Sequence, residues 1–102
     1  MRLIPVVLAV AVCSAVSACG PLQSTAYLLD AEVQIEAART AGADKLAPYE
    51  WTAANLYIHK AREEVGDSDF ETGVDYAGKA QKFAREAREK SLAAAKNENG
   101  NP

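Results

Sequence analysis

The sequence has few of the residues that build disulfides and transition-metal sites. It holds two cysteines and one histidine among 102 residues. Both cysteines, Cys13 and Cys19, lie near the N-terminus, so the rest of the chain has no pair for a disulfide framework. A transition-metal site would depend on carboxylates alone, because His59 has no second histidine or cysteine to join it. Beyond Leu22 no run alternates apolar and polar residues, which argues against a β-sheet protein.

Other absences narrow the classes of function. The formal charge is −3, and lysine and arginine form no cluster typical of nucleic-acid binding. No glycine-rich loop is present to hold phosphates. Ser68 has no histidine and aspartate at a recognisable spacing, and the acidic residues around it lack the spaced ligands of a calcium loop. We therefore expect a protein that is not an enzyme, with no catalytic residues, metal or cofactor, and with His59 as a solvated surface residue.

The first segment of the chain has the layout of an export signal. A charged start at Arg2 precedes an apolar stretch over residues 3–12, and small residues follow at 14–18. The run Val16-Ser17-Ala18-Cys19 resembles the lipobox of bacterial lipoproteins, in which the cysteine thiol receives a diacylglyceryl group and the chain is cut before it. The resemblance implies lipidation at Cys19.

Three other interpretations of this segment are open. Val16 and Ala18 also suit an ordinary signal peptidase, which would leave a soluble periplasmic protein. An uncleaved membrane helix is disfavoured because the apolar stretch is shorter than the roughly 20 residues of a span and contains Pro5. A buried helix of a cytosolic protein fits the Arg2 start least well. Gly20, in place of the aspartate that signals inner-membrane retention, favours the outer membrane facing the periplasm.

Removing the signal leaves roughly 84 of the 102 residues, enough for one small domain. The predicted organisation is a signal peptide at 1–18, a lipidated N-terminus and tether at 19–24, a helical domain at 25–96, and a disordered polar tail at 97–102. We expect an all-α fold with a small antiparallel three-helix arrangement, in which a first helix packs on a long helical hairpin.

Apolar residues at spacings of three and four predict the helices. The first covers about residues 25–41, and Gly42 ends it before a linker over 42–47. Pro48 suits the first turn of the second helix, which Gly66 is expected to end in a left-handed conformation. The predicted inward faces are Leu28, Ala31, Ile35 and Ala38 in the first helix, and Trp51, Ala54, Ile58, Ala61 and Val65 in the second.

The third helix is predicted from Phe70 to about Lys96. Ser68 and Glu71 have the spacing of a capping box at its start. At 1.5 Å per residue it is roughly 40 Å long against about 25 Å for the second helix. Its end should therefore project beyond the hairpin or lie along the first helix. Its inward face is small: Val74, Ala77, Ala80, Ala84 and Ala87.

The turn of the hairpin resembles part of a known repeat. Residues 66–77 are similar to the turn of a tetratricopeptide unit, with a Gly-Asp turn, an aromatic residue and small residues at helical spacing. Only one such unit is present, whereas a repeat array needs about three. A repeat superhelix is therefore excluded.

A second resemblance covers nearly all of residues 27–96. Its motifs are Ala-Gly-Ala at 41–43, Leu-Ala-Pro-Tyr-Glu at 46–50, and Asp-Phe at 69–70 followed by Tyr-Ala at 76–77. They resemble the domain-of-unknown-function family 4398, whose short Ala-rich helical domains occur in bacterial envelope lipoproteins, sometimes ahead of a peptidoglycan-binding domain. The resemblance implies an envelope protein without known catalytic residues. We expect no wall-binding module after residue 96, so the resemblance does not imply attachment to peptidoglycan.

These observations lead to an expected function. We expect a lipid-anchored, non-catalytic adaptor or scaffold of the cell envelope that meets an envelope protein, with self-association as a further option. The basic residues near the C-terminus serve either helix pairing or an acidic partner. An alternative is a glycan- or small-ligand-binding module that uses exposed aromatics. The candidate partner-binding residues are Tyr49, Trp51, Tyr57, Lys79, Lys82, Arg85 and Arg88.

Overall fold

The structure is a computed structural model that describes residues 2–100, apart from the side chains of residues 14–19. The chain forms α1 (Leu3–Thr40), α2 (Ala43–Leu46), α3 (Pro48–Gly66) and α4 (Phe70–Asn99). No strand occurs in the described part of the chain. The all-α prediction is confirmed.

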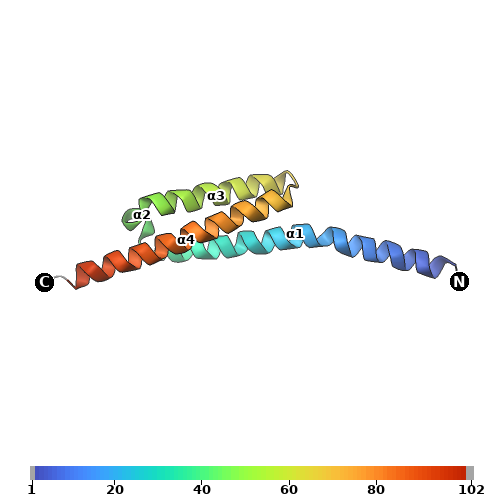
Figure 1. Cartoon of the computed structure of the whole chain (residues 1–102), viewed down its shortest axis with the longest axis horizontal. Coiled ribbons are helices and arrows are strands. Elements are labelled where there is room, and N and C mark those ends of the chain that lie inside the picture. The colour runs from blue at the N-terminus through green and yellow to red at the C-terminus, as the bar shows by residue number, and fades with distance from the viewer. Residues whose placement is uncertain (1, 101–102) are drawn as a thin grey trace.

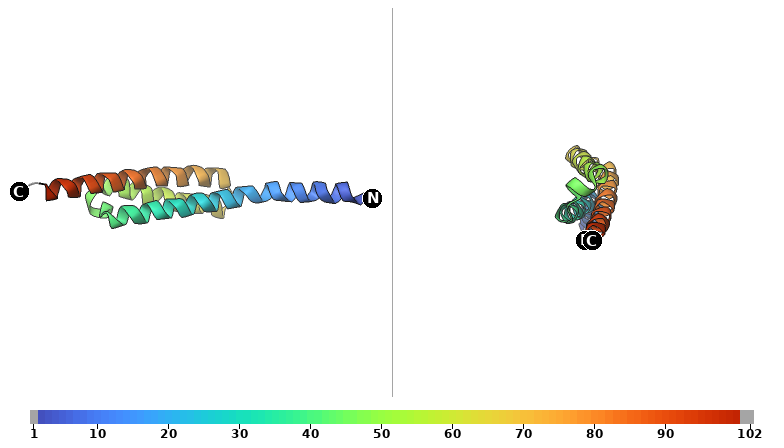
Figure 2. Two further views of the ribbon diagram at one scale, coloured as in Figure 1. Left: turned by 90° about the horizontal axis from the view of Figure 1, so that it is seen from below. Right: turned by 90° about the vertical axis from the view of Figure 1, so that its left-hand side faces the viewer.

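The helices form an elongated three-helix bundle. α1 and α4 run in the same direction, and α3 runs antiparallel to both. The short α2 connects α1 to α3 (Figure 1). Seen end-on, α1, α3 and α4 occupy three corners (Figure 2). The molecule measures 82 × 23 × 14 Å with a radius of gyration of 19.8 Å, against about 13 Å for a compact domain of 100 residues. The molecule is long because the first part of α1 and the last part of α4 project beyond the bundle at opposite ends. The projection of the last helix beyond the hairpin was one of the two arrangements expected from its length.

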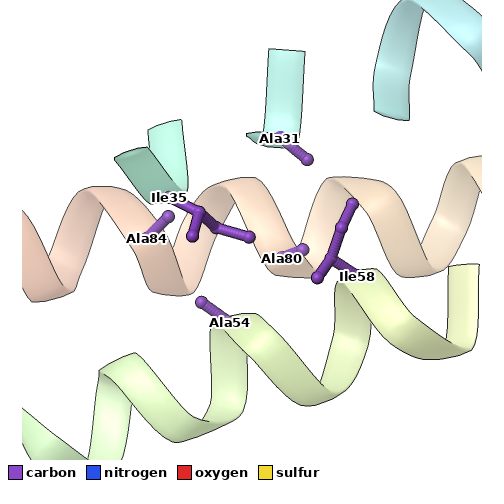
Figure 3. Close-up of a cluster of buried hydrophobic side chains, with 6 residues drawn as sticks. All are labelled: Ala31, Ile35, Ala54, Ile58, Ala80 and Ala84. Atoms are coloured by element: carbon purple, nitrogen blue, oxygen red, sulfur yellow. The ribbon is translucent and has the colours of Figure 1, made fainter. Parts of the chain in front are cut away.

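Alanine builds most of the core. Ala31 and Ile35 of α1 pack with Ala54 and Ile58 of α3 and with two alanines of α4, Ala80 and Ala84 (Figure 3). A second cluster closes the α2 end, formed by Ala38, Ala43, Ala47 and Ala87. Small side chains at these positions let the helix backbones approach closely. The centres of the three predicted inward faces are confirmed, while Leu28, Trp51, Val65 and Val74 are only partly buried.

The connection from α1 to α3 differs from the predicted linker. Gly42 adopts a left-handed conformation with φ of 83°, which glycine reaches without steric cost. The following residues form the single turn of α2, closed by the hydrogen bond from Leu46 N–H to the Gly42 carbonyl at 2.9 Å. Ala43, the first residue of α2, and Ala47, which follows α2, are both buried in the second cluster.

The turn from α3 to α4 corrects two predictions. Gly66 is the last residue of α3, and the left-handed residue is Ser68, with φ of 64°. An N-cap residue needs a non-helical, extended-type backbone, which Asp69 has, with φ of −89° and ψ of 77°. Its carboxylate accepts from Thr72 N–H at 3.2 Å and from Thr72 Oγ1 at 2.9 Å. The predicted Ser68–Glu71 capping box is therefore wrong by one residue.

Helix α1 extends further toward the N-terminus than predicted. Residues 20–24, expected as a tether, lie within α1, where Ser24 is buried and donates its hydroxyl hydrogen to the Pro21 carbonyl at 2.9 Å. Residues 97–99, expected in the disordered tail, belong to α4, whereas residues 101–102 lie outside the described residues. The division into signal peptide, tether and domain stays a prediction.

Candidate partner-binding surfaces

A hollow lies on the outer face of the α3–α4 hairpin. It has a volume of about 540 Å³, and no residue of α1 lines it. We call it the hairpin groove, lined by Pro48, Tyr49, Thr52, Ala53, Leu56, Tyr57 and Phe83. Tyr49 is 71% exposed and Leu56 53% exposed, so large apolar side chains face solvent along α3.

Aromatic rings form one side of the groove. Tyr57 stacks on Phe83 with ring centroids 5.6 Å apart and an interplanar angle of 9°. Tyr57 also stacks on Tyr76 at 5.9 Å, and Tyr49 meets the edge of Phe83 at 6.2 Å. Aromatic pairs in such geometry contribute about 0.5–1.5 kcal/mol each, and the rings of Tyr49, Tyr57 and Phe83 form a contiguous aromatic side of the groove.

Two ammonium groups lie against these rings. Lys79 Nζ is 5.5 Å from the ring centroid of Tyr57 and 5.6 Å from that of Tyr76. Lys60 Nζ lies 6.0 Å from the Tyr76 centroid. Neither ammonium forms an ion pair with a carboxylate among residues 2–100. This end of the groove therefore carries positive charge that remains available to an anionic group.

Trp51 does not belong to this surface. It packs against both alanine clusters on the α1 side of α3, and the guanidinium of Arg39 lies 5.8 Å from its ring centroid. The predicted set of Tyr49, Trp51 and Tyr57 is thus divided between two faces of α3. Phe83 and Leu56, rather than Trp51, complete the groove, and Leu56 was missed because it lies on a second apolar stripe of α3.

The four predicted basic residues do not share one patch. Lys79, Lys82, Arg85 and Arg88 are all exposed, but nine helical residues turn by about 180° between the first and the last. Only Lys79 adjoins the aromatic rings. None of the four forms an ion pair with a carboxylate in the described part of the chain, whereas Lys90 of the same basic segment pairs with Glu50 of α3. Their role in partner binding stays a prediction.

A second exposed apolar surface lies on α1. We call it the α1 stripe, made of Leu22, Ala26, Leu29 and Val33. Leu29 is 57% exposed and Val33 64% exposed. Val33 lies two positions from both Ala31 and Ile35, and two residues turn a helix by about 200°, so the stripe faces away from the core. Its spacing of three and four was visible in the sequence, beside the inward face.

Charged groups elsewhere form surface pairs. Glu50 accepts from Lys90 Nζ at 3.0 Å across α3 and α4, and Arg62 pairs with Glu32 between α3 and α1. A hydrogen bond from its own backbone N–H, then Lys90, holds the pKa of Glu50 below its ordinary value. His59 is exposed and lies 3.1 Å from Glu63, as expected for a surface residue. No group of residues with metal-ligating geometry occurs among the described side chains.

The predicted lipid-attachment residue has its side chain outside the described residues. The apolar part of α1 that precedes Cys19 is exposed along residues 3–12. Within the described chain, no helix combines the length and apolarity needed to cross a membrane.

A family model described as "Domain of unknown function (DUF4398)" matches residues 26–99. The chain belongs to this family. The match begins within the α1 stripe and ends at the last residue of α4, so the DUF4398 region contains the whole groove and the stripe from Ala26 onward. No curated protein and no solved structure matches the chain. The predicted likeness to a tetratricopeptide unit therefore stays a prediction.

Proposed function

We propose that this DUF4398 protein is a lipid-anchored, non-catalytic adaptor or scaffold of the bacterial cell envelope, facing the periplasm from the outer membrane. The run Val16-Ser17-Ala18-Cys19 supports the anchor, because it has the order of residues of a lipobox. Two or three acyl chains bind a bilayer durably, since each buried CH₂ contributes about 0.8 kcal/mol. Confinement to a surface then holds the bundle ready to meet a partner.

The hairpin groove is the observation that carries the adaptor proposal. Contiguous exposed apolar surface of this kind is typical of interaction sites, and aromatic side chains are enriched in the energetic centres of interfaces. Tyr49 and Leu56 offer apolar contact, and Lys79 offers a charge beside it. A partner with an apolar face and an adjacent acidic group would fit this arrangement.

One experiment tests the anchor and another tests the groove. Metabolic labelling with a fatty acid should mark the wild-type chain and leave Cys19→Ser unlabelled; equal labelling contradicts the anchor. A photo-crosslinking residue at position 56 in intact cells should give a defined adduct that Tyr49→Ala weakens. The same residue at exposed position 89, which lies outside the groove, is the control. Equal adducts from both positions contradict the adaptor role of the groove.

The second candidate is a glycan- or small-ligand-binding module. The volume of the hollow, about 540 Å³, lies within the usual range of ligand pockets of about 300–1,000 Å³. Trp51 fluorescence is a poor probe of such binding, because Trp51 lies on the other face of α3. Ring proton shifts of Tyr49 and Tyr57 on adding soluble cell-wall glycan fragments report on the groove directly. Unchanged shifts at saturating fragment contradict this candidate.

A further inference from the structure

We infer that the occupant of the hairpin groove is the α1 stripe of a second copy of this chain, so that neighbouring molecules pair head to tail. The inference rests on the proposed function, because the lipid anchor holds the copies at one height above the membrane. Three features of the described residues lead to it, namely the placement of the two surfaces, their heights, and their charges.

The two surfaces lie on opposite sides of the bundle. The groove is on the face of the α3–α4 hairpin that α1 does not reach, and the α1 stripe faces away from the core. A patch that binds a different patch on the next copy makes a heterologous contact, which builds rings or open rows. The stripe covers eleven helical steps from Leu22 to Val33, about 17 Å, and the α3 side of the groove covers nine steps from Pro48 to Tyr57, about 14 Å.

The heights of the two surfaces also agree. In the core, Ala31 lies beside Ala80 and Ile58, and Ile35 lies beside Ala84 and Ala54 (Figure 3). Position 33, halfway between 31 and 35, is therefore level with position 56 on α3. Two copies anchored at equal height would place Val33 of one opposite Leu56 of the other, at the apolar centre of the groove.

Opposite charges beside the two surfaces also lie at the same level along the bundle. α1 and α4 run in the same direction, and Ala31 and Ala80 share one cluster, so Asp30 is level with Lys79. Asp30 is exposed beside the stripe and forms no ion pair within the described chain. Lys79 is likewise available against the rings of Tyr57 and Tyr76. Pairing of two α1 stripes with each other would instead bring acidic side chains together.

Confinement strengthens such a contact. The two surfaces are short, and tethering both partners to one membrane raises their effective concentration without any new contact. The Ala-rich face of α4 is not available for self-association, because Ala77, Ala80, Ala84 and Ala87 are fully buried within the bundle. The groove and the stripe, in contrast, are exposed.

Site-specific crosslinking tests the pairing in the full-length chain. Two differently tagged copies are co-expressed, one with Val33→Cys and one with Leu56→Cys, and membranes are treated with a short bifunctional maleimide. Both side chains are exposed, so the substitutions should leave the fold intact. We expect a mixed-tag dimer at least about fivefold above two controls, the parent chain and the pair Val33→Cys with Glu89→Cys. A mixed-tag yield equal to the controls overturns the inference, as does an equal yield from two Val33→Cys copies.

A charge exchange provides the second test. Lys79→Glu in the groove copy should lower the dimer yield by about two- to fivefold, the range of an exposed ion pair. Asp30→Lys in the stripe copy should restore it. Failure of the exchange to restore the yield contradicts the predicted register.

The two proposals fail separately. Fatty-acid labelling without a mixed-tag crosslink overturns the head-to-tail pairing and leaves the anchor. A mixed-tag crosslink in a chain that takes no label overturns the anchor and leaves the pairing.

Discussion

The ring of Tyr57 lies flat on the ring of Phe83, with centroids 5.6 Å apart and 9° between the planes. The contact joins α3 to α4 at the edge of the first alanine cluster, against which both rings pack, and both rings also line the groove. It therefore does two things at once, since it stabilises the hairpin and shapes the groove. The same two side chains would decide both the stability of the hairpin and its binding surface.

Removing the Phe83 ring should weaken the fold and open the groove. Phe83→Ala is expected to lower the free energy of unfolding by about 2–3 kcal/mol, less than the loss at a fully buried phenylalanine, because Phe83 is only partly buried. Urea denaturation followed by circular dichroism measures it. Tyr49→Ala, at an exposed ring, should change stability by less than about 0.5 kcal/mol. Equal losses for the two variants would contradict the assigned packing.

Two glycines of α4 form a matched pair. A Cβ at Gly73 would lie 2.5 Å from Val65 Cγ2, whereas a Cβ at Gly78 meets nothing within 4 Å. Alanine is the better helix former by about 1 kcal/mol, so Gly78→Ala should raise the melting temperature. Gly73→Ala should lower it, because Val65 is stiff at χ1 and cannot move aside freely. A gain from Gly73→Ala would show that α3 and α4 separate more easily than this packing implies.

The start of α4 distinguishes two capping schemes. With Asp69 as the N-cap, Asp69→Ala should cost about 1 kcal/mol of unfolding free energy. Ser68→Gly should instead stabilise the protein, because a non-glycine residue in the left-handed region costs about 1–2 kcal/mol. If Ser68 were the cap, its replacement would destabilise. Thermal melts of both variants beside the wild type decide between the schemes.

Acid should weaken the hairpin through Glu50. Its own backbone N–H, and then the Lys90 ammonium, hold the pKa of its carboxyl below the ordinary value of 4.5. A lowered pKa in the folded state contributes stability above about pH 4.5 that is lost as the pH falls through the folded value. Glu50→Gln should therefore flatten the fall in melting temperature between pH 6 and pH 3. Lys90→Met should flatten it less, since the backbone hydrogen bond is the larger cause; a steeper fall in either variant would contradict the assignment.

The helices and their inward faces could be predicted because they depend on local order in the chain. The spacing of Ala31, Ile35 and Ala38 fixes one face of α1, and Pro48 marks the start of α3 wherever the helix packs. The turn of the hairpin was predicted less well. Ser68 and Asp69 are both good N-cap residues, and the choice depends on the backbone angles that the closing hairpin imposes.

The candidate surfaces depended on tertiary packing. Tyr49, Trp51 and Tyr57 are equivalent as aromatic residues of one helix. The positions of α1 and α4 decide that Trp51 packs against both alanine clusters, whereas Tyr57 packs against one cluster and lines the groove with Tyr49. Leu29 and Val33 belong to an apolar stripe as regular as the inward one. The structure leaves them exposed because the hairpin packs on the alanine face, which permits closer approach.

Residue order alone was enough to predict that this chain is helical, where α3 lies, and which small residues face inward, because these follow from the 3.6-residue period and from proline and glycine. It also indicated the DUF4398 family, since that depends on residue order alone. Which of the two apolar faces of α1 and of α3 is covered depends on how the helices pack. A helix can bury one face and present another, and the choice is made by the close packing of all three.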